Sequence, residues 1–206
     1  MSHHRQTVIA VLGDELVAGH GDARCLGWVG RVAARTLPTV AAARFYPLGV
    51  PQEDSAALAR RSMTEADLRF VPEADNRLVL APGSFDVDAG ISTARSRLNL
   101  ANVLDAALAA EVATFVVGPP PSLNADRNRR IGELNAGFSD VALRRGIGYV
   151  DTFAPLQNHA GWMRDLASSA DGLPGQEGYG LLAWLVLHRG WFDWLGVPAP
   201  ATSDSV

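Results

Sequence analysis

The sequence lacks several features that would place it in a particular class of protein. It contains one cysteine, Cys25, so no disulfide can form within the chain, and we interpret this residue as a small buried side chain. No stretch approaches the ~18–20 consecutive apolar residues that a membrane-spanning helix requires. The apolar run at residues 7–12 is short, and no small-residue cleavage site of a secretory signal follows it. We therefore expect a soluble, cytoplasmic protein without a membrane span.

Concentrated positive charge is also absent. The chain carries 18 basic and 22 acidic side chains, which gives a formal net charge of −4 at pH 7. Its two short arginine clusters, at residues 60–61 and 127–130, fall in helical patterns, and we interpret them as solvated faces. Binding to nucleic acid requires many closely spaced Lys and Arg side chains, so no nucleic-acid partner is expected.

Short apolar runs alternate with helical patterns along the 206 residues, a length that suits one α/β domain. The candidate strands are residues 7–12, 41–46, 78–81, 114–117 and 148–150. Nearly continuous apolar runs are typical of parallel strands that helices cover on both faces. We therefore predict a flavodoxin-like three-layer α/β/α sandwich with a five-stranded parallel sheet. It forms a single domain over residues 1–197, and a flexible tail rich in Pro, Ala and Ser follows at 198–206.

Apolar residues spaced by three or four predict the helices. One stripe consists of Leu98, Ala101, Leu104, Leu108 and Val112. A second consists of Ile131, Leu134, Phe138, Val141 and Ala142. The last helix, about residues 177–188, is apolar almost all round, so it is either deeply buried or shared with a partner chain. A homodimer through this C-terminal apolar helix is therefore one hypothesis, and we interpret His188 as packed on the helix.

Ligands of parallel α/β sheets bind beyond the carboxyl ends of the strands. The loops that begin at Gly13, Gly49, Gly83 and Pro119 should therefore line one crevice. The loop around Asp171 should join them if the last helix packs beside the sheet. Any site of chemistry is expected in this crevice.

Several segments in these loops carry a resemblance to a known family. The first is VLGDELVAGHGD from Val11, followed by a Gly-Trp pair at 27–28. The next are LGVPQED around Gly49 and PGSFD around Gly83. The later ones are VVGPPP, Asn135, the YVD at 149–151 and DGLPGQEGY from Asp171. In this order they resemble the SGNH hydrolases, also called the GDSL lipase/acylhydrolase family, over nearly the whole chain.

The resemblance implies an acyl hydrolase in which a serine, a glycine, an asparagine and a histidine act together with an aspartate. In this chain the serine position holds Glu15 and the asparagine position holds Phe85. The histidine position holds Pro174, unless the histidine has been deleted, since this segment is one residue shorter than usual. Two members of the set are retained: Gly49, which supplies an oxyanion N–H, and Asp171, the acid of the triad.

These replacements remove most of the serine mechanism. A carboxylate at position 15 has no proton to lose to a base, and it cannot act as a serine does. Loss of the asparagine donor alone costs roughly 2.7–4 kcal/mol of transition-state stabilisation. Our first hypothesis is a non-hydrolytic pseudo-enzyme that binds a small ligand or a protein partner in the old crevice. The residues expected to shape that crevice are Asp14, His20, Gly83, Phe85, Asp86 and Pro174.

The alternative is a hydrolase of a small or carbohydrate ester with relocated machinery. Glu15 would then be a carboxylate nucleophile, Asp171 the retained acid, and His159 a base from a new place. A simpler interpretation of Glu15 is an acid that stabilises the N-terminus of the following helix. The acids near the crevice match no metal motif, so we expect no metal and no cofactor.

Overall fold

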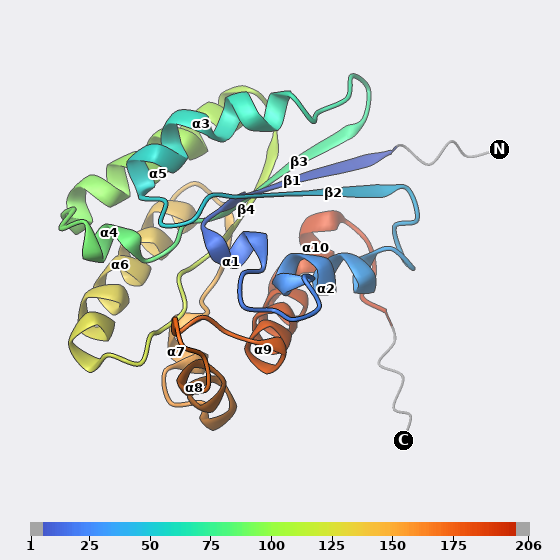
Figure 1. The fold of residues 1–206 in the computed structure, drawn as a ribbon. Helices are drawn as coiled ribbons and strands as arrows, with labels where there is room; N and C mark the ends of the chain where they lie inside the picture. The colour runs from blue at the N-terminus through green and yellow to red at the C-terminus, as the bar shows by residue number, and fades with distance from the viewer. Residues whose placement is uncertain (1–5, 201–206) are drawn as a thin grey trace.

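Five parallel strands form the centre of the molecule in the order β2-β1-β3-β4-β5 (Figure 1). In the computed structural model, which describes residues 6–200, they are β1 (Thr7–Gly13), β2 (Ala43–Gly49), β3 (Asp75–Ala81), β4 (Ala113–Val117) and β5 (Gly148–Val150). This strand order is that of the flavodoxin-like sheets. The predicted five-stranded α/β architecture is confirmed.

Strand β2 is longer than predicted. It extends from Ala43 to Gly49 instead of 41–46, and it runs through Pro47, which pairs with Val11 of β1. Proline lacks an N–H and is excluded from central strands, but β2 lies at the edge of the sheet, where one side needs no hydrogen bonds. The extension matters because it brings Gly49 level with Gly13 at the carboxyl end of β1.

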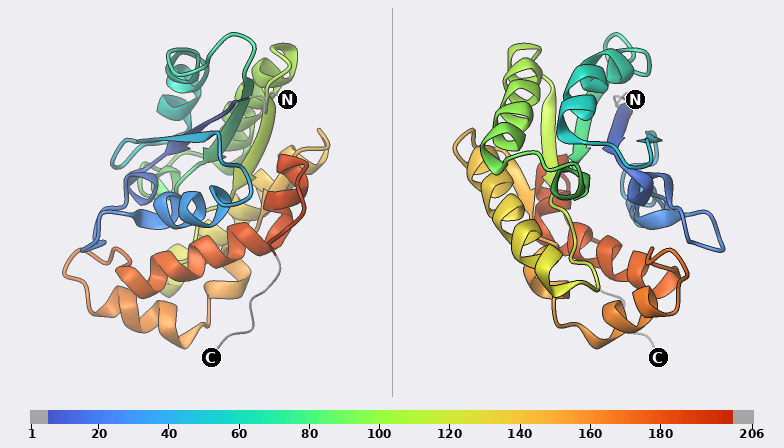
Figure 2. Two further views of the ribbon diagram at one scale, coloured as in Figure 1. Left: turned by 90° about the vertical axis from the view of Figure 1, so that its right-hand side faces the viewer. Right: turned by 60° about the vertical axis from the view of Figure 1, so that its left-hand side comes forward.

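Helices cover both faces of the sheet (Figures 1 and 2). On one face lie α3 (Ser55–Asp67), α5 (Thr93–Ala109) and α6 (Ala125–Leu143), and on the other lie α2 (Gly27–Thr36) and α9 (Gln176–Val186). Alternate residues of each strand enter the two cores. In β1, Ile9 and Val11 face α2 and α9, whereas Ala10 and Leu12 face the opposite helices. Burial on both faces explains why the strand sequences are apolar without alternation.

Shorter helices lie at or near the carboxyl ends of the strands. They are α1 (Glu15–Ala18), α4 (Phe85–Asp88), α7 (Phe153–Leu156) and α8 (Ala160–Ala167). After α9 the chain continues as a π-helical turn (Leu187–Trp191), and α10 (Phe192–Leu195) follows. None of the helices within residues 6–200 is both long and apolar enough to cross a membrane.

The two predicted apolar stripes have different outcomes. All five residues of the second stripe are buried on α6, as predicted. Of the first stripe, Leu104 is fully buried as predicted, but Leu98 and Leu108 are 48% and 47% exposed and Val112 follows the end of α5. The buried face of α5 also contains Leu100 and Val103, which are not part of the predicted stripe. Helix α5 has leucines on two faces, and only its packing between α3 and α6 decides which face is covered.

The C-terminal apolar helix is largely core. Leu185 and Val186 of α9 are buried, whereas Trp184 is 55% exposed and stacks its ring on exposed His188 with centroids 4.4 Å apart. Helix α9 ends at Val186, slightly earlier than predicted, and beyond it the backbone kinks at Arg189 and Gly190, where Gly190 has a φ of 90°. The homodimer through this helix stays a prediction.

Two further predictions concern the burial of Cys25 and the C-terminal tail. Cys25 is exposed in the turn before α2, with a φ of 53°, so its interpretation as a buried side chain is wrong. The turn is held by Asp22, which accepts hydrogen bonds from the N–H groups of Arg24 and Gly27. This arrangement leaves the cysteine side chain outside. Of the predicted tail, residues 198–200 are exposed and residues 201–206 lie outside the described part.

Candidate functional site

A cavity of about 340 Å³ lies beyond the carboxyl ends of the strands, and we call it the crevice. Four segments supply its walls: the turn after β1, the turn after β3, the loop after β4 with the start of α6, and the α8–α9 region. The lining residues are Asp14, Glu15, Leu16, Ser84, Asp88, Pro120, Pro121, Ser122, Leu123, Asn124, Arg127, Trp162, Leu166, Asp171, Gly172, Leu173 and Pro174. The loop that begins at Gly49 is not among the lining segments.

Glu15 lies in this wall at the first position of α1. Its Oε2 accepts a hydrogen bond from the backbone N–H of Gln52 at 2.7 Å, and Gln52 adopts a left-handed conformation with a φ of 55°. The N-cap of α1 is Asp14, whose Oδ1 accepts from the N–H of Leu16 at 3.0 Å. Glu15 therefore connects the crevice to the loop after β2. The residue that caps the N-terminus of α1 is Asp14 and not Glu15.

Asp14 is the most deeply buried acid of the crevice, with 6% of its surface exposed. Burial, and then the charges of Glu15 and Glu53, raise its pKa to about 7. Its Oδ2 lies against Gly83, where a Cβ would come within 1.9 Å of that oxygen. Glycine is required at position 83 because the carboxyl group of Asp14 occupies the space of a side chain.

Gly49 is required for a similar reason. A Cβ at this position would lie 2.5 Å from both the carbonyl oxygen of Asp14 and the N–H of Ala18. The missing side chain lets α1 pack directly on the end of β2. Gly49 therefore sets where Asp14 and Glu15 stand, although its own atoms do not line the crevice.

An arginine beneath the crevice holds the ends of β1 and β2. The Nη2 group of Arg61 donates to the carbonyl oxygens of Gly13 at 3.2 Å and Leu48 at 2.9 Å. The same guanidinium pairs with the buried Glu53 through bonds of 2.5 and 2.6 Å. The interpretation of Arg61 as part of a solvated face is wrong, because its guanidinium is bound to the strand ends and to buried Glu53.

The turn after β3 places Ser84, not Phe85, in the crevice. Phe85 begins α4, is partly exposed and does not line the cavity. Asp86, which is 2% exposed, accepts a hydrogen bond from the N–H of Ser55 at 2.6 Å through Oδ1, and its Oδ2 has no partner among the described residues. Asp86 therefore fastens α4 to the start of α3.

A second arginine that we interpreted as solvated lines the crevice itself. Arg127 at the start of α6 donates from Nη2 to Ser84 Oγ at 2.9 Å. It also binds both oxygens of Asp88, at 2.9 and 2.6 Å. This cluster links α4 to α6 across the crevice wall. No local sequence pattern indicated it, since Asp88 lies 39 positions before Arg127.

The last loop brings Asp171 and Pro174 to the crevice. Asp171 is exposed, and hydrogen bonds from the Ser169 hydroxyl and the N–H of Leu173 hold its pKa below the usual range. His20 also lowers this pKa through its charge, so it lies near Asp171 while staying outside the lining. Pro174 is buried in the wall.

His159 lies outside the crevice. It is the N-cap of α8, where its Nδ1 accepts a hydrogen bond from the N–H of Trp162 at 3.3 Å, and its side chain is exposed. Within residues 6–200, no histidine lines the cavity. The crevice therefore contains two serine hydroxyls, of Ser84 and Ser122, without an imidazole beside them.

No three acidic, histidine or cysteine side chains of the described residues come close enough together to hold a metal ion. Asp22, one of the acids near the first segment, instead pairs with Arg31 and receives hydrogen bonds at the start of α2. The Arg31 side chain is the main reason that the pKa of Asp22 falls to about 2.

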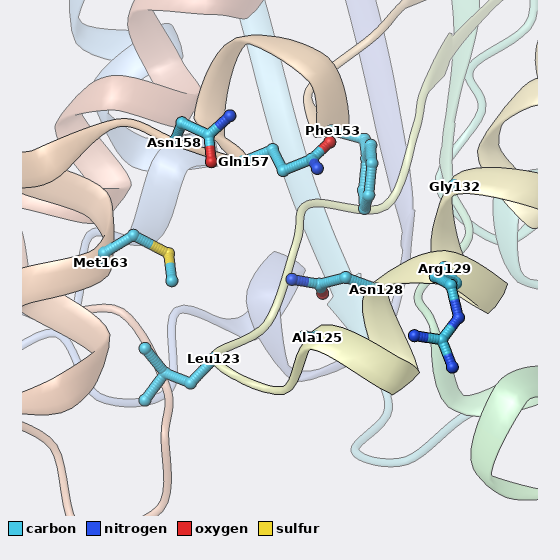
Figure 3. Close-up of a pocket in the computed structure, with 9 residues that line it drawn as sticks. All are labelled: Leu123, Ala125, Asn128, Arg129, Gly132, Phe153, Gln157, Asn158 and Met163. Atoms are coloured by element: carbon cyan, nitrogen blue, oxygen red, sulfur yellow. The ribbon is translucent and has the colours of Figure 1, made fainter.

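A second cavity of about 410 Å³ lies beside the crevice (Figure 3). Its walls come from the start of α6, from α7 and from the first turn of α8, and Leu123 lines both cavities. Figure 3 shows amide side chains of Asn128, Gln157 and Asn158 around it, with Met163 opposite. No carboxylate lines this second cavity.

Comparison with known proteins gives consistent results. Residues 11–181 match the model of the GDSL-like Lipase/Acylhydrolase family. No curated protein sequence matches the chain significantly.

Solved structures resemble the whole fold. The psychrotrophic esterase EstA from Pseudoalteromonas sp. superposes with a TM-score of 0.70 at 18% identity, over 92% of this chain and 98% of that one. A catalytic mutant of Axe2, an acetylxylan esterase from Geobacillus stearothermophilus, gives 0.73 at 15%, over 94% and 97%. The lipase/acylhydrolase from Enterococcus faecalis gives 0.72 at 21%, over 96% and 100%. The chain belongs to the GDSL-like lipase/acylhydrolase family.

Proposed function

We propose that this protein binds a small molecule in the crevice and does not hydrolyse esters by the serine mechanism. The observation that carries the proposal is the composition of the crevice wall, which contains Glu15 and, among the described residues, no histidine. The resemblance to the family assigns the serine position to Glu15. The serine mechanism requires a hydroxyl nucleophile and a base that removes its proton. Loss of the nucleophile and base of a serine hydrolase costs on the order of 10⁶ in kcat.

The cavity supports binding independently of catalysis. Its volume of about 340 Å³ is within the range of small-molecule sites, and its wall combines leucine and proline side chains with charged groups. Gly49 and Gly83 keep the close packing that shapes it.

The experiment is a hydrolysis assay combined with ligand binding. The wild-type protein and Glu15→Ala are compared on p-nitrophenyl acetate, and a library of small molecules is screened by thermal shift. We expect no turnover above the buffer rate in either protein, and at least one ligand whose stabilisation is lost in a crevice variant. A kcat in the wild type that disappears in Glu15→Ala would contradict the proposal.

A second candidate is ester hydrolysis with relocated machinery, on a small or carbohydrate ester. It is supported by the carboxyl pair of Asp14 and Glu15, since a pKa near 7 makes Asp14 able to exchange a proton beside an acid at the nucleophile position. One structural neighbour is an acetylxylan esterase, which suggests acetylated sugars as test substrates. This candidate requires that Asp14→Asn and Glu15→Gln each abolish turnover. His159→Ala tests whether a base outside the cavity takes part.

A further inference from the structure

The crevice has more negative than positive charge in its wall. Four carboxyl groups line it, and the one guanidinium among the lining residues, Arg127, already pairs with Asp88. Asp14, Glu15 and Asp171 form no ion pair within residues 6–200. A concave site lined by uncompensated charges of one sign concentrates ligands of the opposite sign.

Asp14 supplies a second and separate indication. Its side chain is almost fully buried, Oδ1 accepts the cap hydrogen bond from Leu16, and Oδ2 accepts no hydrogen bond from the described residues. This oxygen is not fully enclosed by the protein, so a hydrogen-bond donor of a ligand can reach it. Because Asp14 lines the crevice, a ligand there can bring that donor.

Glu15 lies beside Asp14, and one of its carboxylate oxygens is free to accept a hydrogen bond. Its Oε2 binds the N–H of Gln52, while Oε1 accepts no hydrogen bond from the described residues. The lining also includes the apolar side chains of Leu16, Leu166 and Leu173. The crevice therefore offers a polar, negatively charged end and an apolar body.

We propose that the ligand of the crevice is a small organic amine whose ammonium group binds Asp14 and Glu15 and whose apolar part packs on the leucines. The inference rests on the proposed function, since it names the ligand class of the same site. An ammonium group carries three donors, so it can satisfy Asp14 Oδ2 and Glu15 Oε1 together. Ligands with a carboxylate are disfavoured because the same acids repel them.

A metal ion fits the crevice less well than an organic cation. Ca²⁺ and Mg²⁺ take about six to eight closely placed oxygen ligands. Among the described residues no three candidate ligands come that close together. The acids are spread over the wall of a cavity, which suits a cation that is larger and supplies its own hydrogen-bond donors.

Amine binding should depend on pH through Asp14. The groups that face Asp14 are Glu15 on its own element, Glu53 before α3, which is paired with Arg61, and Tyr179 of α9, whose pKa is raised by burial. With a pKa of about 7 in the free protein, Asp14 loses its proton when an ammonium group binds. The dissociation constant should therefore fall as the pH rises from 6 to 8.

The test is calorimetry with three probes of the same chain length: n-butylamine, n-butanol and butyrate. We expect butylammonium to bind at least about tenfold more tightly than butanol, with no measurable binding of butyrate. Asp14→Asn, which keeps a good N-cap residue, and Glu15→Gln should each weaken butylammonium binding about tenfold or more. Asp14→Asn should also remove the pH dependence. Gln157→Ala in the second cavity is the matched control and should change nothing.

The outcomes separate this inference from the proposed function. The amine assignment is wrong, while small-molecule binding stands, if butanol binds as tightly as butylammonium. The same conclusion follows if Asp14→Asn and Glu15→Gln both bind butylammonium as tightly as the wild type does. Failure of butylammonium to bind at millimolar concentration also overturns the amine assignment. The proposed function fails instead if the protein hydrolyses p-nitrophenyl acetate in a Glu15-dependent reaction.

Discussion

Replacement of Asp14 by asparagine should stabilise the fold, and the gain should increase with pH. In the folded protein, burial raises the pKa of Asp14 from 3.8 to about 7. As the pH rises, the carboxyl group of Asp14 therefore loses its proton at lower pH in the unfolded chain than in the folded protein. The free energy of unfolding falls as the pH rises between the two pKa values. Asparagine stays neutral and caps α1 about as well as aspartate does.

The size of the effect follows from the two pKa values. At pH 8 the raised pKa destabilises the wild type by about 4 kcal/mol, and at pH 5 by about 1.7 kcal/mol. The advantage of Asp14→Asn over the wild type should thus grow by roughly 2.5 kcal/mol between pH 5 and pH 8. Any constant difference in hydrogen bonding between the two side chains cancels in this comparison.

The assay is urea unfolding of both proteins at pH 5, 6, 7 and 8. Asp105→Asn is the control, because the Arg145 side chain lowers the pKa of Asp105, and a lowered pKa contributes a nearly constant stability across this window. Parallel stability curves for the wild type and Asp14→Asn would refute the argument. They would mean that water or a structural change compensates the buried carboxyl group.

Three further predictions concern the frame of the crevice. Gly83→Ala should cost about 1–3 kcal/mol in urea unfolding and abolish ligand binding, since its Cβ would collide with Asp14; a fully stable variant would contradict this. Arg61→Met should cost about 3–5 kcal/mol because it leaves Glu53 buried without a partner, and Arg61→Met with Glu53→Gln should recover part of that loss. The triple variant Glu15→Ser, Phe85→Asn, Pro174→His should remain inactive on p-nitrophenyl acetate, because position 85 does not line the cavity; recovered turnover would show that an asparagine there reaches the crevice.

The sequence predicts the sheet and one helix face well for a physical reason. Strands β1 and β4 are buried on both faces, so their apolar runs are unambiguous, and α6 has a single apolar stripe. The predicted stripe on α5 is wrong at Leu98 and Leu108 because that helix has apolar residues on more than one face. The sequence does not predict the extra length of β2, because Pro47 fits a strand only at the edge of a sheet. The strand order that places β2 at the edge comes from the structure.

The site is only partly accessible to sequence reasoning. The resemblance to the family predicts the replacements at positions 15, 85 and 174. The roles of Arg61 and Arg127 are not, since each depends on partners from other elements of the fold. The raised pKa of Asp14 is also hidden, because its main cause is burial in the folded chain, with further contributions from the charges of Glu15 and Glu53.

Leu123 gives the two cavities a common wall, and this has a consequence for regulation. A ligand in the second cavity that requires another rotamer of Leu123 changes the shape of the crevice at the same time. Thermodynamic reciprocity then demands that the two ligands alter each other's affinity by the same factor. Asn128 forms three hydrogen bonds with Ser122, which restrain the residue next to Leu123. The coupling would therefore depend on the rotamer of the Leu123 side chain and not on movement of its backbone.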